Sequence, residues 1–169
     1  MSQLQALNCA DAEEACDLLR RCCGAERWVL AMEEGRPYRD VEHLVAHGHM
    51  AWATMTPQDV LEALDHHPRI GTDLEQLRQK FGSTADWAAG EQAGAQVASE
   101  EVLRALRDGN ERYEQRFGHI FVVCATGQTA EGMLDALRSR LDHGPEEELK
   151  IAAGEQAKIL EIRLRKLAA

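Results

Sequence analysis

Residues 145–168 read PEEELKIAAGEQAKILEIRLRKLA, and this stretch predicts a long α-helix. Pro145 suits a first helical position, three glutamates follow at the positive end of the helix dipole, and arginine and lysine lie near its negative end. Steps of four and three residues define one stripe along the helix, made of Leu149, Ala153, Gln156, Leu160, Arg163 and Leu167. The stripe turns Arg163 inward. In the alternative arrangement, the neighbouring Leu164 packs inward and Arg163 extends toward solvent.

The rest of the chain also favours helices, because apolar residues recur at helical spacing with capping residues before them and glycine or proline after them. Thr56-Pro57-Gln58-Asp59 is a strong helix start, and that helix must end near His67 because Pro68 follows. Thr72 predicts the cap of the next helix. We expect helices over about residues 11–23, 28–32, 40–54, 57–67, 72–81, 99–117, 129–141 and 145–168.

The run IFVVCA at residues 120–125 is the only β-like stretch of the sequence. A lone strand would have no partner for its backbone, so we expect a buried extended segment instead. These patterns together predict an all-α protein, a single-domain helical bundle of about eight helices over residues 1–169.

Composition narrows the classes of function. The 169 residues carry a net charge of 19 − 29 = −10 and a pI near 5.2, which argues against nucleic acid and anionic membranes as partners. The acidic N-terminus and the lack of a long apolar stretch predict a cytoplasmic protein. The five cysteines are odd in number and form no CxxC motif, so we expect buried, reduced thiols at Cys9, Cys16, Cys22, Cys23 and Cys124.

Two further side chains are candidates for chemistry. His67 lies at a helix end against Pro68, where it can act as an acid or base or simply cap the helix. Glu91 lies on the same helical side as Trp87 and Gly94, a small apolar face where a charge needs a partner or a purpose, unless the position reaches solvent.

Two other classes of function remain open at this point. His43 and His47 share one helical face and could serve a metal-dependent hydrolase, although no acid follows as in HExxH and no third ligand is evident; the alternative is a polar helix face. The acidic surface and the close-packing face of Gly90 and Gly94 could instead belong to a non-catalytic helical protein-interaction module.

A set of short motifs occurs in a specific order along nearly the whole chain. The motifs are Arg36-Pro37-Tyr38, Trp52, His67-Pro68-Arg69-Ile70-Gly71, Glu91-Gln92-Ala93-Gly94-Ala95, Asn110 with Tyr113, Phe117-Gly118-x-x-Phe121-Val122, and the C-terminal Glu155, Ile159, Arg163-Leu164 and Leu167. In this order and spacing the sequence resembles the 2-oxo-4-hydroxy-4-carboxy-5-ureidoimidazoline (OHCU) decarboxylases of urate degradation.

The resemblance implies a carbon–carbon lyase, a carboxy-lyase that converts OHCU to (S)-allantoin in purine catabolism with no cofactor and no metal. It also implies an all-helical fold and a homodimer. The catalytic residues that it implies are His67, Glu91 and Arg163. The substrate contacts that it implies are Pro68, Gln92, the hydroxyl of Thr84, and the main chain of His119, Ile120, Phe121 and Val122.

Overall fold

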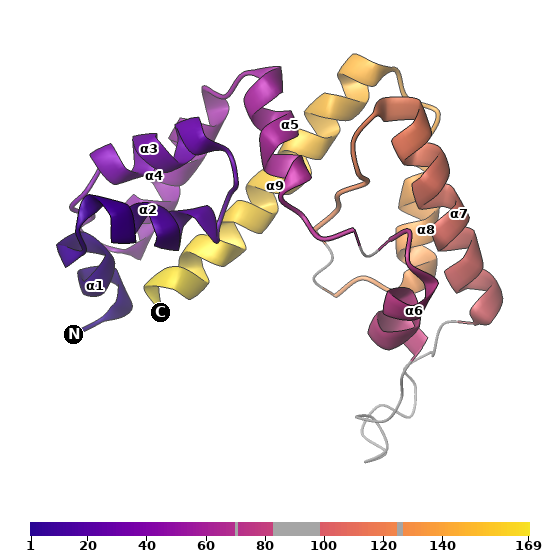
Figure 1. Cartoon of the computed structure of the whole chain (residues 1–169), viewed down its shortest axis with the longest axis horizontal. Coiled ribbons are helices and arrows are strands. Elements are labelled where there is room, and N and C mark those ends of the chain that lie inside the picture. The colour runs from indigo at the N-terminus through magenta and orange to yellow at the C-terminus, as the bar shows by residue number, and fades with distance from the viewer. Residues whose placement is uncertain (70, 83–98, 125–126) are drawn as a thin grey trace, which may run out of the picture. The chain divides into compact units, whose positions relative to one another are not determined.

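The computed structural model describes residues 1–69, 71–82, 99–124 and 127–169, and these residues contain helices and no strand (Figure 1). The α-helices are α1 (Gln3–Cys9), α2 (Ala12–Arg20), α3 (Glu26–Glu34), α4 (Val41–Ala53), α5 (Pro57–Asp65), α6 (Leu74–Leu77), α7 (Glu100–Phe117), α8 (Ala130–Arg140) and α9 (Pro145–Ala168). A π-helical turn, Arg78–Gly82, continues α6. The all-α prediction is confirmed.

The chain divides into two compact units. The terminal unit combines Met1–His67 with Leu149–Ala169, and the central unit is Pro68–Glu148. In the terminal unit, α3 contacts α2, α4 and α5, and the buried Trp28 indole donates from Nε1 to the carbonyl of Gly48 at 3.0 Å. Gly48 must lack a side chain, because a Cβ there would lie 2.5 Å from Leu164 Cδ1.

Helix α9 is also fixed by a hydrogen bond to α4 within the terminal unit. The Trp52 indole donates from Nε1 to the carbonyl of Ala153 at 3.0 Å. Leu164 is fully buried, as the alternative interpretation of this helix expects, while Arg163 is half-buried beside it. The buried positions of α9 repeat every four residues, at Glu148, Ala152, Gln156, Leu160, Leu164 and Ala168. The predicted stripe therefore coincides with the buried face only at Gln156 and Leu160.

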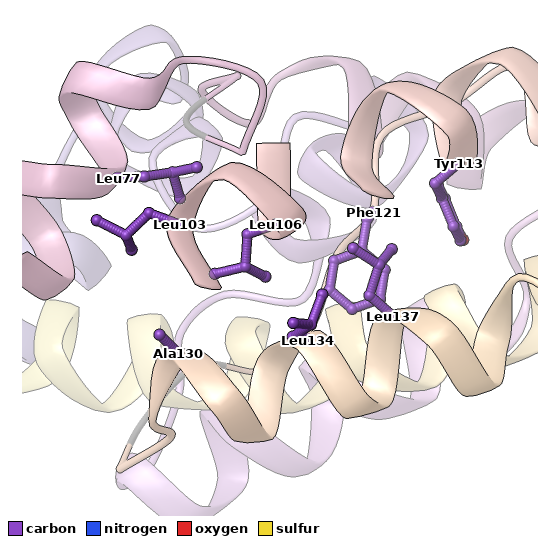
Figure 2. Packing of buried hydrophobic residues seen from close by; sticks show 8 residues of the cluster. All are labelled: Leu77, Leu103, Leu106, Tyr113, Phe121, Ala130, Leu134 and Leu137. Atoms are coloured by element: carbon purple, nitrogen blue, oxygen red, sulfur yellow. The ribbon is translucent and has the colours of Figure 1, made fainter. Parts of the chain in front are cut away.

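The core of the central unit forms where α7 packs against α8 and α6, and α7 and α8 lie side by side in Figure 1. Figure 2 shows its buried cluster, which consists of Leu77, Leu103, Leu106, Tyr113, Phe121, Ala130, Leu134 and Leu137. Gly109 brings the two long helices together, because a Cβ on it would lie 2.6 Å from the Leu137 side chain. This packing places the buried segment after α7 against the aromatic end of the cluster.

Helix boundaries follow the capping chemistry of the sequence. The Thr56, Ser99 and Thr129 side chains accept backbone N–H bonds at the starts of α5, α7 and α8, as expected. Gly118 ends α7 with φ 76°, a left-handed conformation that a residue with a Cβ rarely adopts. The expected cap at Thr72 is wrong, since Asp73 next to it accepts from two backbone N–H groups of α6.

Two other expectations need correction. Helix α1 was not expected, although Ser2 and Gln5 form a complete capping box at its start. All five cysteines are free, but only Cys16, Cys22 and Cys23 are buried, while Cys9 is exposed. Residues 120–124 are neither helix nor strand, and Phe121 and Val122 within them are buried, which agrees with a segment that is partly buried and not helical. In the described part of the chain, no helix is long and apolar enough to span a bilayer.

Candidate active site

His67 is held in place by the end of α5. The helix closes at His66, and the backbone N–H of His67 donates to the carbonyl of Leu64 at 3.1 Å. Pro68 then prevents the helix from continuing. Since the backbone is fixed on both sides, the imidazole of His67 projects from a rigid position, half-buried in the terminal unit.

The partner of this imidazole comes from the opposite end of the sequence. His67 Nε2 and Gln156 Oε1 on α9 lie 2.5 Å apart. Gln156 is 0 % exposed, and its Nε2 atom has no hydrogen-bond partner at standard distance among the described residues. The same side chain lies close enough to the Cys23 thiol to lower the pKa of that thiol. The amide thus connects the imidazole with the buried turn after α2.

The surroundings of His67 favour its neutral form. Burial lowers the pKa of His67 below its ordinary value, and the hydrogen bond with Gln156 partly opposes that effect. The positive charges of Arg163 and His66 lower the pKa of His67 further. A histidine with a lowered pKa is uncharged near pH 7, so it is ready to accept a proton.

Arg163 brings the positive charge of the site. Its Nη1 donates a long bond of 3.4 Å to the carbonyl of Cys22, and no carboxylate among the described residues lies within salt-bridge distance of it. A pocket of about 460 Å³ reaches Arg163 and is lined by Gln3, Leu18, Arg21, Cys22, Arg163, Lys166, Leu167 and Ala169. His67 is outside this lining. A half-buried guanidinium without a counter-charge is suited to binding an anion or a carbonyl group.

The neighbouring thiols are poor candidates for nucleophiles. Burial raises the pKa of Cys22 to about 12, although the Arg163 charge opposes the rise. Burial also raises the pKa of Cys23 to about 11, although the Ala25 backbone N–H and the nearby Gln156 amide oppose the rise. Both thiols therefore remain protonated at neutral pH, and their contribution is to pack around the site.

In the central unit, residues 119–122 present their backbone. His119 is buried against the rings of Phe117 and Tyr113, and its Nδ1 donates to the carbonyl of Ile120 at 3.1 Å. Arg140 Nη1 donates to the carbonyl of Val122 at 2.7 Å. Within the described residues, the backbone N–H groups of this segment have no acceptor. The segment therefore offers N–H donors to a ligand, whereas the His119 ring is already occupied.

The Arg140 side chain that binds the Val122 carbonyl belongs to a buried ion cluster. Glu148 is 0 % exposed, with Oε1 2.6 Å from Arg140 Nε and Oε2 3.1 Å from His143 Nδ1, and the Tyr113 hydroxyl donates to it as well. Burial alone raises the pKa of Glu148, but the hydrogen bonds from Arg140, Tyr113 and His143 outweigh that effect and hold the pKa below its ordinary value. No pattern in the sequence identifies Arg140 or Glu148, because their pairing depends on how two helices meet.

The remaining site residues divide into two groups. Pro68 is exposed at the start of the central unit. Thr84, Glu91 and Gln92, together with the face of Gly90 and Gly94, lie outside the described residues. Gln156 belonged to the predicted stripe but had no predicted role. Its signal is an amide on a helical face whose residues one turn before and after it, Ala152 and Leu160, are apolar.

His43 and His47 have structural partners. His43 Nδ1 accepts from the backbone N–H of Arg39 at 3.2 Å, and His47 Nε2 donates to the carbonyl of Ala31 at 3.2 Å. Both rings also stand edge-on to Tyr38. The described residues contain no group of three or more His, Cys, Asp or Glu side chains arranged to hold a metal ion. The geometry thus favours the polar helix face that was the alternative interpretation of these histidines.

Comparison with known proteins gives a consistent result. A family model described as OHCU decarboxylase matches residues 8–165, which span both compact units. The chain is 35% identical over 148 residues to the "Uric acid degradation bifunctional protein TTL" of Arabidopsis thaliana, covering 86% of this chain and 45% of that protein. This chain therefore spans less than half the length of the plant relative.

Two further matches cover most of both partners. The "2-oxo-4-hydroxy-4-carboxy-5-ureidoimidazoline decarboxylase" of Mus musculus is 34% identical over 134 residues, which is 78% of this chain and 73% of the mouse protein. The solved structure "Crystal structure of OHCU decarboxylase in the presence of (S)-allantoin" aligns with a TM-score of 0.72 and 33% identity, over 89% of this chain and 96% of that one.

Proposed function

We propose that this chain, which belongs to the OHCU decarboxylase family, decarboxylates OHCU to (S)-allantoin in urate degradation. The observation that carries the proposal is His67, a half-buried imidazole with a lowered pKa. The charge of Arg163, which has no carboxylate partner among the described residues, contributes to lowering that pKa. These two side chains supply a proton-transfer group and an anion-binding group, which are the two functions that this reaction needs.

The substrate itself explains why such a simple site is enough. In OHCU, the departing carboxylate sits on a ring carbon that also bears a hydroxyl group, next to a ring C=N bond. When the carbon–carbon bond breaks, the electron pair forms a C=C bond and the imine nitrogen takes up the charge. The reaction therefore needs no cofactor as an electron sink, and the protein has to orient the substrate and transfer protons.

The proton transfers are assigned to His67. Loss of the hydroxyl proton restores a carbonyl, and allantoin is complete when the carbon that bears the ureido group gains one proton and the former imine nitrogen gains a second proton from water. An imidazole that is neutral at pH 7 can accept the first proton and return one to that carbon. Delivery to a single face would give the (S) product.

Binding of the substrate is assigned to the other residues. Arg163 holds an anionic or carbonyl group through a forked contact, because its guanidinium offers parallel N–H donors. The other expected contacts are Pro68, the hydroxyl of Thr84, and the backbone N–H groups of residues 119–122, which have no acceptor among the described residues. Glu91 and Gln92 fix the ureido and ring N–H groups as acceptors. We expect the protein to work as a homodimer, as the family resemblance suggests, and in the cytoplasm, as its sequence composition suggests.

Absorbance of freshly generated OHCU tests this function directly. Wild-type protein is expected to speed the decay of the OHCU signal, with the same rate after exhaustive treatment with EDTA. The His67→Asn variant, confirmed to be folded by circular dichroism, is the matched control and is expected to match the buffer rate. A wild-type rate equal to the buffer rate would refute the proposal, and activity that EDTA removes and zinc restores would refute the cofactor-free mechanism.

A further inference from the structure

Gln156 holds the catalytic candidate His67 through one buried amide. We propose that Gln156 is a positioning residue, which keeps the hydrogen of the neutral His67 ring on Nε2 and leaves Nδ1 as the nitrogen that exchanges protons with substrate. The catalytic part of this inference rests on the function proposed above. The part that concerns the imidazole itself stands on the geometry of the terminal unit.

The direction of the hydrogen bond follows from the chemistry of the amide. A carboxamide oxygen only accepts hydrogen bonds, so at 2.5 Å from Gln156 Oε1 the His67 Nε2 must carry the hydrogen. In a neutral ring the other nitrogen, Nδ1, then has the free lone pair. A base that acts through Nδ1 needs a partner that holds Nε2 in this form through every turnover.

Gln156 is well placed to be that partner. It is 0 % exposed, and the residues one turn before and after it on α9, Ala152 and Leu160, are also 0 % exposed. The bond from Trp52 to the carbonyl of Ala153 fixes the same part of the helix. Water has no access to replace the amide, so the orientation of the His67 ring is set by α9.

The NH2 group of the Gln156 amide shows that packing alone does not explain this residue. Among the described residues its Nε2 has no hydrogen-bond partner at standard distance and lies near only a weak acceptor, the Cys23 sulfur, an arrangement that costs stability. An apolar side chain of similar size, such as Met, would fill the same space without leaving a donor unpaired. The feature that Met would lose is the acceptor for His67.

A neutral acceptor also suits the charges around the imidazole. The charged groups that act on His67 in the terminal unit are Arg163 from α9 and His66 from the end of α5. Both lower the pKa of His67 and so favour the neutral ring. A carboxylate at position 156 would stabilise the imidazolium instead and would keep a proton on Nδ1. The amide therefore orients the ring without charging it.

Nuclear magnetic resonance titration of His67 tests the inference without relying on activity. The variants are Gln156→Met, which removes the acceptor, and Gln156→Glu, which makes it negative. Because the Gln156 bond raises the pKa of His67, the Met variant is expected to titrate below wild type and the Glu variant above it. Long-range proton–nitrogen spectra of the neutral wild-type ring are expected to show the hydrogen on Nε2.

Kinetics on OHCU give the second readout. In Gln156→Met, kcat is expected to fall about 10- to 100-fold, by analogy with the cost of removing the group that orients a metal-bound histidine, while KM stays close to wild type. The pH at which the rate rises is expected to shift in the same direction as the measured pKa. Glu161→Gln is the matched control, because it changes the partner of His49 on the same helix. This control is expected to change neither the His67 titration nor kcat.

Several results would overturn the inference. Equal His67 titration in wild type and both variants, or a hydrogen on Nδ1 of the neutral ring, would show that Gln156 does not determine which nitrogen of the His67 ring carries the hydrogen. Loss of the folded state in both variants would assign Gln156 a structural role only. Absence of OHCU turnover by wild type, with the two opposite pKa shifts present, would refute the proposed function and still support the tautomer assignment.

Discussion

Replacing Arg140 by Met is expected to destabilise the central unit strongly. The Arg140 side chain is 8% exposed and its partner Glu148 is 0% exposed. The substitution removes a charged contact of 2.5 Å to Glu148 and the bond of 2.7 Å to the carbonyl of Val122. Leaving a buried carboxylate without its cation typically costs ~3–5 kcal/mol, a large part of the ~5–15 kcal/mol that stabilises a typical protein.

Urea unfolding followed by circular dichroism measures this loss. The double variant Arg140→Met/Glu148→Gln is expected to be more stable than Arg140→Met alone by at least ~1 kcal/mol, because it removes the orphaned charge. Arg138→Met, an exposed arginine on the same helix, is expected to stay within ~0.5 kcal/mol of wild type. A loss below ~1 kcal/mol in Arg140→Met, or a double variant that is less stable than the single one, would refute the reasoning.

The pH dependence of the stability of Arg140→Met tests the direction in which Arg140 shifts the pKa of Glu148. In wild type the folded pKa of Glu148 lies below its ordinary value, so this group stabilises the fold above its unfolded pKa of ~4.3 and loses that contribution as the pH falls. In Arg140→Met the pKa of Glu148 is expected to rise, since a main contact that lowers it is gone. The difference in free energy of unfolding between wild type and variant should therefore become smaller as the pH falls from 7 to 4. A gap that widens would contradict the assignment.

The remaining predictions concern turnover of OHCU. His67→Asn is expected to lower kcat by ~10²- to 10⁴-fold with the fold retained, whereas His66→Asn is expected to be tolerated because that ring is exposed; similar activity of the two variants would exclude the role of His67. Arg163→Lys is expected to lower kcat/KM substantially, because a point charge cannot make a forked contact, while Arg165→Lys should be near neutral; equal effects would make Arg163 an ordinary surface residue. Glu91→Gln is expected to lower kcat at unchanged Tm, and unchanged kinetics would place Glu91 at a solvent-facing position.

Local chemistry made most of the helices predictable. Ser99 and Gly118 bound α7 as expected, because a side-chain acceptor at one end and a left-handed residue at the other depend only on neighbouring residues. The same logic failed by one residue at Thr72, where Asp73 is the better acceptor for two N–H groups. The same chemistry starts α1, where Ser2 and Gln5 form a capping box.

Tertiary packing decided what the sequence pattern left open. On α9, the predicted stripe and the buried stripe share Gln156 and Leu160, differ by one residue elsewhere, and are nearly equally apolar. The contact of Leu164 with the bare backbone of Gly48 selects the stripe that repeats every four residues. His67 was identifiable from Pro68 and the helix end. Its partner Gln156 lies 89 positions away, so no local pattern could have paired them.

The handedness of the product tests the central claim most directly. OHCU, generated fresh and free of other enzymes, is mixed with the wild-type chain and followed by circular dichroism until the signal is constant. A site that protonates the ureido carbon from one face is expected to yield (S)-allantoin, faster than OHCU decays in buffer. Racemic allantoin formed at the buffer rate would contradict the account, since it would mean that neither His67 nor any other group of the chain takes part in the reaction.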